Sequence, residues 1–83
     1  MTLAKLRKHS VTLAGHRTSL SLEEAFWQRL KLEAEAQGRP LAELLAEIDR
    51  GRQGNLSSAV RVYLLERLLT ASQDSEKPPK VAP

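Results

Sequence analysis

Basic residues are concentrated at the N-terminal end of this sequence. Lys5, Arg7, Lys8 and Arg17 are the charged residues of the first 18 positions, which contain neither Asp nor Glu. The whole chain has a net charge of +3, so the uneven placement of the charges matters more than their total. Because cations without neighbouring acids attract polyanions, we expect Lys5, Arg7 and Lys8 to contact a polyanionic partner.

A second candidate site lies at Asn55, Ser57 and Ser58, just before the last apolar segment. The first turn of a helix has unpaired N–H groups and the positive end of the helix dipole, and such a terminus binds anions. Asn55 is also a favourable N-cap residue. Helix capping therefore explains Asn55 as well as an anion site does.

The other polar residues give little support for catalysis or metal binding. His9 and His16 are seven residues apart, with no Cys or carboxylate close in sequence, which is poor spacing for metal ligands. His16 is better explained by contact with an anion or by ordering the turn beside it. There is neither a phosphate-binding glycine loop nor a nucleophile with a base partner. We therefore expect no metal, no cofactor and no enzymatic activity.

Two short alternating segments and three helical ones must position these residues. Met1–Lys8 is expected to be a flexible basic arm, followed by a strand at Ser10–Leu13, a turn at Ala14 and Gly15, and a second strand at Arg17–Leu22. In the second strand, polar and apolar residues alternate, so that its two faces differ. The polar face carries Arg17, Ser19 and Ser21, and the apolar face carries Thr18, Leu20 and Leu22.

A period of about 3.6 residues then replaces the alternation. Phe26, Leu30 and Ala34 mark a first helix that ends at Gly38. Leu41 to Asp49 forms a short second helix, and the third runs from Asn55 to about Leu69. The segment 72–83 is polar, contains prolines and has no period, so we expect a disordered tail after a domain at 9–71.

The composition favours a homodimer. The chain has three aromatic residues and no cysteine, which leaves a monomer of 83 residues little with which to fill a core of its own. The apolar stripe of the last helix is also too wide for burial on one side only. We expect the dimer core to consist of Leu20, Leu22, Phe26, Leu30, Val60, Tyr63, Leu64 and Leu68.

From about His9 to Leu69 the sequence resembles small bacterial domains of the ribbon-helix-helix family. The similar segments, in this order, are Gly-His-Arg-Thr-Ser, Leu-Glu before Phe-Trp, Glu-Ile-Asp, and Asn-Leu-Ser-Ser-Ala-Val-Arg-Val. The resemblance implies a mainly α fold with an N-terminal β-ribbon, formed by an intertwined homodimer. The sequence departs from the common pattern in having an additional strand-like segment and an inserted helix at 41–49.

In that family, the ribbon enters the major groove of double-stranded DNA and its outward side chains contact bases. The resemblance assigns base contacts to Arg17, Ser19 and Ser21, among which Arg17 can donate two hydrogen bonds to guanine. A surface arginine is often only solvated, and Ser21 with Glu24 also resembles a capping box. Contacts with DNA phosphates are assigned to Asn55, Ser57, Ser58, Lys5, Arg7, Lys8 and His16.

The resemblance thus implies a bacterial transcriptional regulator that binds DNA as a homodimer, or as a higher-order assembly on DNA. The alternative is an antitoxin or adaptor that binds a partner protein, which the surplus leucines of the inserted helix favour. No apolar run is long enough to span a membrane. A cytoplasmic, nucleoid-associated location is expected, although the basic start also allows an organellar transit peptide.

Overall fold

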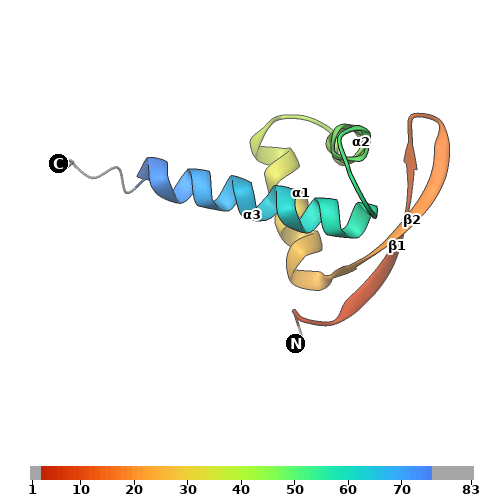
Figure 1. The fold of residues 1–83 in the computed structure, drawn as a ribbon, viewed down its shortest axis with the longest axis horizontal. Coiled ribbons are helices and arrows are strands. Elements are labelled where there is room, and N and C mark those ends of the chain that lie inside the picture. Colours follow the sequence, from red (N-terminus) through yellow and green to blue (C-terminus); the bar gives the residue numbers. More distant parts are fainter. Residues whose placement is uncertain (1–2, 76–83) are drawn as a thin grey trace.

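The computed structural model describes residues 3–75, and the side chains of residues 3–71. A hairpin of strands β1 (Leu6–Leu13) and β2 (His16–Glu23) precedes the helices α1 (Glu24–Ala36), α2 (Leu41–Arg50) and α3 (Leu56–Ser75). Figure 1 shows the hairpin curving around one end of the helical layer, while α3 extends away from it at the other end. The expected fold class, a β-ribbon followed by helices with an extra strand and an inserted helix, is confirmed.

The two strands form an antiparallel sheet within a single chain. They are joined by Ala14 and Gly15, whose φ angles of 53° and 84° are both positive. Two such residues form the type I′ turn, whose twist matches that of a hairpin. The register pairs Leu13 with His16 and continues without a break to Leu6 and Glu23.

The first strand begins earlier than expected. β1 starts at Leu6 instead of Ser10, so Arg7 and Lys8 lie in a strand and not in a flexible arm. The residues before it also have a structural role, because the backbone N–H groups of Glu24 and Ala25 donate to the carbonyl groups of Lys5 and Leu3. The N-terminal segment therefore caps α1, because the side chain of the N-cap residue Glu23 makes no capping hydrogen bond. The capping box considered for Ser21 and Glu24 is not formed.

One face of the hairpin is covered by the helices. Its buried side chains, Leu13, Leu20 and Leu22, join a single core with residues from all three helices. The ring of Trp27 stacks on His9 of β1, with 3.6 Å between the ring centroids. The helical members of the core are Leu30, Ala34, Leu44, Leu45, Ile48, Leu56, Val60 and Leu64.

The inserted helix α2 completes this core. Gly38, with a φ of 66°, follows the end of α1, and the carbonyl group of Pro40 accepts hydrogen bonds from Glu43 and Leu44 at the start of α2. Leu44, Leu45 and Ile48 are buried, and α2 packs against α3, β1 and α1. The extra strand and the inserted helix therefore belong together structurally: β1 adds apolar surface to the hairpin, and α2 covers that surface.

The last helix is longer than expected. α3 continues to Ser75, so the first four residues of the predicted tail belong to a helix. The rest of that tail, residues 76–83, lies outside the described residues. Asn55 caps α3 as predicted, since its Oδ1 accepts a hydrogen bond of 2.8 Å from the backbone N–H of Ser58.

Candidate nucleic-acid interface

The face of the hairpin that points away from the helices is polar. Residues directly opposite each other in an antiparallel pair lie on the same face. Four pairs alternate onto this face: Leu6 with Glu23 at the base of the hairpin, and then Lys8 with Ser21, Ser10 with Ser19, and Thr12 with Arg17. We call the six residues of the last three pairs the outer face. Five of them are exposed, and Ser21 is partly buried. The outer face carries hydrogen-bond donors from two basic side chains and four hydroxyl groups, and no carboxylate.

The three residues predicted from the sequence to contact bases, Arg17, Ser19 and Ser21, all belong to the outer face. Ser10 and Thr12 were not predicted as site residues. The alternation of polar and apolar residues places Ser10 and Thr12 on the same face of β1. Only the pairing register of β1 with β2 shows that Arg17 lies on this face too. The two-residue turn at Ala14 and Gly15 was the available signal, because it determines the register.

One edge of β2 has no strand beside it among the described residues. In a hairpin with a two-residue turn, the residues that flank the turn exchange hydrogen bonds, and every second residue does so along the strands. His16, Thr18, Leu20 and Leu22 therefore direct their backbone groups toward β1. The backbone groups of Arg17, Ser19 and Ser21 point to the open edge, and accordingly the Ser21 carbonyl accepts a hydrogen bond of 2.7 Å from Ser57 Oγ.

The beginning of α3 lies beside this open edge. Ser57 Oγ holds the helix terminus against β2, while Asn55 caps the N–H of Ser58. The N–H groups of the first two helical residues, Leu56 and Ser57, have no partner within an α-helix. The three predicted phosphate contacts of this region thus have different positions: Asn55 and Ser58 are exposed, and the Ser57 hydroxyl is occupied by Ser21.

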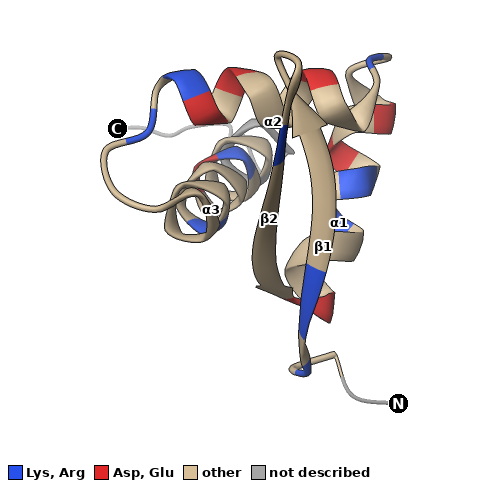
Figure 2. Ribbon diagram, turned by 90° about the vertical axis from the view of Figure 1, so that its right-hand side faces the viewer, with Lys and Arg blue, Asp and Glu red and all other residues tan. Residues whose placement is uncertain are grey.

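An ion pair joins the base of the hairpin to α3. Arg61 donates to both carboxylate oxygens of Glu23, at 2.9 and 3.2 Å. The hydrogen bond from Arg61 is the main reason that the pKa of Glu23 lies below its ordinary value. Figure 2 shows basic residues both on the hairpin and on the helices, and acidic residues on the helices and at the base of the hairpin.

The other predicted phosphate contacts are less well placed than Lys8. Arg7 lies on the opposite face of β1, because it pairs with the buried Leu22, and its Nε lies 3.9 Å from Glu24 Oε1. His16 pairs with the buried Leu13 at the turn, and its own side chain is exposed. Lys5 is exposed and precedes β1.

An apolar groove of about 440 Å³ lies between α1 and α3. Phe26 and Leu68 line it, together with Val62 and Leu65, which are each 54% exposed. Arg61 belongs to the same groove, so the groove continues from the hairpin base where Arg61 binds Glu23. Of the residues predicted for a dimer core, five are already buried within one chain, namely Leu20, Leu22, Leu30, Val60 and Leu64. Phe26 and Tyr63 are partly buried, and Leu68 is 48% exposed.

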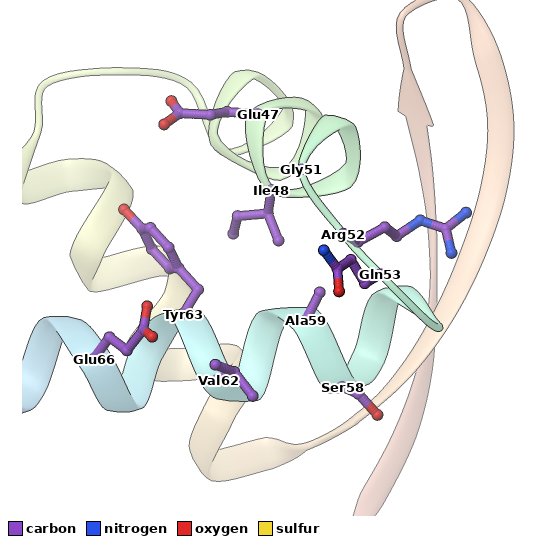
Figure 3. A pocket seen from close by; sticks show the side chains of 10 residues that line it. All are labelled: Glu47, Ile48, Gly51, Arg52, Gln53, Ser58, Ala59, Val62, Tyr63 and Glu66. Carbon is purple, nitrogen blue, oxygen red and sulfur yellow. The ribbon is translucent and has the colours of Figure 1, made fainter.

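A second hollow, of about 420 Å³, lies between α2 and α3 (Figure 3). Ile48, Ala59 and Tyr63 form its apolar part. Two of its charged residues are engaged elsewhere: Glu47 pairs with Arg39, and Arg52 pairs with Asp49, each at 2.6 Å. Among residues 3–75, no group of three or more His, Cys, Asp or Glu side chains could hold a metal ion. No helix in this part of the chain is long and apolar enough to cross a membrane.

The family model of the ribbon-helix-helix domain matches residues 6–68 of the chain. Comparisons with curated proteins and with solved structures give no match. Members of this family are generally DNA-binding transcription regulators or antitoxins, typically without enzymatic activity, and they typically bind DNA as dimers. Because the match covers both strands, α1, α2 and most of α3, the chain belongs to the ribbon-helix-helix domain family.

Proposed function

We propose that the protein is a bacterial transcriptional regulator that binds specific sequences of double-stranded DNA as a homodimer, without enzymatic activity. The observation that carries this proposal is the outer face, whose three cross-strand pairs present Arg, Lys, Ser and Thr side chains, while the carboxylate at the base of the same face, that of Glu23, is bound by Arg61. An antiparallel ribbon fits the major groove, where such side chains can contact base edges. Arg17, Ser19 and Ser21 are the proposed base contacts.

The second copy of the chain would add its β2 strand along the open edge of β2. Pairing centred on Ser19 would place Arg17 of each copy opposite Ser21 of the other, so that all three outward-pointing residues take part. The carbonyl group of Ser21 can accept from Ser57 and from a second strand, because it has two lone pairs. The apolar groove between α1 and α3 continues from this edge and supplies further contact area for the second copy.

The start of α3 is the proposed phosphate contact. It lies at the end of the ribbon, beside Ser21, and its first N–H groups and dipole favour an anion. Asn55 and Ser58 flank these groups at the surface. A phosphate bound here would position the ribbon without contributing base preference.

The partner-protein alternative loses the feature that favoured it in the sequence. In the sequence, α2 has more leucines than a minimal core requires. In the structure, two of these leucines, Leu44 and Leu45, are fully buried in the chain's own core. An exposed apolar stripe remains on α3, formed by Val62, Leu65, Leu68 and Leu69, and we assign it to the second copy. A monomer that binds an unrelated protein through α3 would favour the alternative.

Replacement of Arg17 by alanine tests the proposed base contact. After selection of the preferred site from random DNA, Arg17→Ala should weaken binding to that site by about 1–3 kcal/mol and relax the preference at one base position in each half-site. Arg7→Ala is the matched control, because it removes the same side chain from the opposite face of the hairpin. If Arg17→Ala leaves the selected motif unchanged, the outer face does not contact bases and the proposal is wrong.

A further inference from the structure

We infer that β1 forms the outer strands of a four-stranded sheet in the dimer and binds the DNA phosphates on either side of the major groove. The strand order would be β1, β2, β2 of the second copy and β1 of the second copy. This inference rests on the proposed function and extends it to three residues, Lys8, Ser10 and Thr12. It differs from a ribbon with one strand per chain in the width of the surface that faces DNA.

The sides of the hairpin differ in a way that selects β2 as the inner strand. β1 carries Lys8 beside Arg7, whereas β2, with Arg17 and Glu23, has no lysine, and lysine in particular is typical of strands that remain at the edge of a sheet. The start of α3 and the apolar groove both lie on the side of β2. A second copy that pairs with β2 therefore covers apolar surface at the same time.

The width of such a sheet decides which part of DNA each strand meets. With about 4.8 Å between neighbouring strands, the two β1 strands lie about 14 Å apart and the two β2 strands about 5 Å apart. The major groove is about 12 Å wide. Both β2 strands fit inside it, whereas both β1 strands lie over its borders, where the phosphates are.

The side chains of β1 suit that position. Lys8 is a flexible cation on the outer face, directly opposite Ser21, and Ser10 and Thr12 add hydroxyl donors on the same face. All three are exposed. Lysine and hydroxyl side chains commonly contact phosphate, and such contacts carry no base preference of their own.

A cysteine scan tests the strand order, since the chain has no cysteine of its own. In the proposed sheet, the two Ser19 residues are direct neighbours with Cα atoms about 5.5 Å apart, within the range of a disulfide. Under oxidising conditions Ser19→Cys should therefore form a covalent dimer, and Ser10→Cys should not. A covalent dimer of the Ser10→Cys variant would make β1 the inner strand and overturn the inference, as would the absence of cross-linking in both variants.

Salt dependence of DNA binding tests the phosphate contacts. Lys8→Ala should lower the slope of log K against log salt concentration by about 2 for a dimer, because each copy loses one phosphate contact. The preferred base sequence should be unchanged. Arg7→Ala, on the opposite face of the same strand, should alter the slope less. Ser10→Ala and Thr12→Val should weaken binding to preferred and random DNA equally.

Uncharged phosphate analogues locate the contact. Methylphosphonates placed one at a time along the site should weaken the binding of the unaltered protein at both borders of the groove, and at least one of these effects should vanish in Lys8→Ala. If Lys8→Ala matches Arg7→Ala in every measurement, or if it relaxes the base preference, β1 does not lie over the phosphates. The proposed function fails separately, through an unchanged motif in Arg17→Ala.

Discussion

Glu33 is a buried carboxylate that joins α1 to α3. Glu33 is 7% exposed, and its Oε2 accepts hydrogen bonds of 2.8 Å from both Gln37 Nε2 and Arg67 Nε. Gln37 also donates to the hydroxyl group of Tyr63 at 2.7 Å. Burial acts to raise the pKa of Glu33, but the hydrogen bonds from Gln37 and Arg67 outweigh it, and the pKa lies below its ordinary value. The native structure therefore stabilises the charged form.

A lowered pKa makes stability depend on pH with a definite sign. The contribution of the Glu33 carboxylate is complete above its ordinary pKa of 4.5 and is lost as the pH falls through the lower value of the folded state. Glu23, whose pKa is also lowered, acts in the same direction. We expect the free energy of unfolding to decrease in acid below this pH.

Replacement of Glu33 by glutamine tests this expectation. Near neutral pH, Glu33→Gln should lower the free energy of unfolding by about 1–2 kcal/mol, because the hydrogen bond from Arg67 loses its charged acceptor. In acid, where Glu33 itself is protonated, the variant and the unaltered protein should differ little. Urea denaturation at both pH values measures the difference. An equal loss at both would show that the charge of Glu33 contributes nothing.

At the scale of elements, the N-terminal segment connects the hairpin to the first helix. The carbonyl groups of Leu3 and Lys5 accept hydrogen bonds from the first two residues of α1, at 2.8 and 2.9 Å. These are backbone contacts, so the type of side chain at either position does not affect them directly. The segment therefore has two separable properties, a structural one in its backbone and an electrostatic one in its lysine.

Deletion of residues 1–5 should consequently destabilise the fold by about 1–2 kcal/mol, the value of two backbone hydrogen bonds. Lys5→Ala retains both carbonyl groups and should leave the thermal unfolding curve unchanged, although it removes a charge that can attract DNA. Circular dichroism on heating provides the measurement. A truncated chain as stable as the full one would show that these two contacts do not cap α1 in solution.

At the scale of the whole molecule, the protein has a core in each chain and an uncovered apolar stripe on α3. Val62, Leu65, Leu68 and Leu69 are each about half exposed. Figure 1 shows α3 continuing beyond the other elements, so these residues lie along a helix that the rest of the chain covers only in part. A second copy would bury them together with the groove beside Phe26.

Leu65→Glu should therefore separate the proposed dimer. Loss of two leucine contacts of roughly 1.5 kcal/mol each should raise the dissociation constant about 100-fold. Leu32→Glu is the matched control, since Leu32 is also 54% exposed but lies outside the groove. Sedimentation should show dimers for the unaltered protein and for Leu32→Glu, and monomers for Leu65→Glu at the same concentration. A stable, folded monomer of the unaltered chain would contradict the dimer and the four-stranded sheet.

The order of elements could be predicted from the sequence because local patterns determine it. Alternation over Arg17–Leu22, the helical period after it, Gly38 at the end of α1 and Asn55 at the start of α3 all act within a few residues of the chain. Each prediction is confirmed by the structure. The same local signals failed at β1, whose first residues, Leu6 to His9, have no clear alternation of polar and apolar side chains.

Only the tertiary structure decided how these elements combine. The turn predicted at Ala14 and Gly15 is compatible with a hairpin, but the sequence alone does not exclude pairing of β1 with another copy, since two strands of different copies can satisfy the same backbone groups. Pairing within the chain brings Ser10 and Thr12 to the face of Arg17, and it adds apolar surface that α2 must cover. These relations join residues of different elements, so they depend on how strands and helices pack together, which the pattern within each element does not specify.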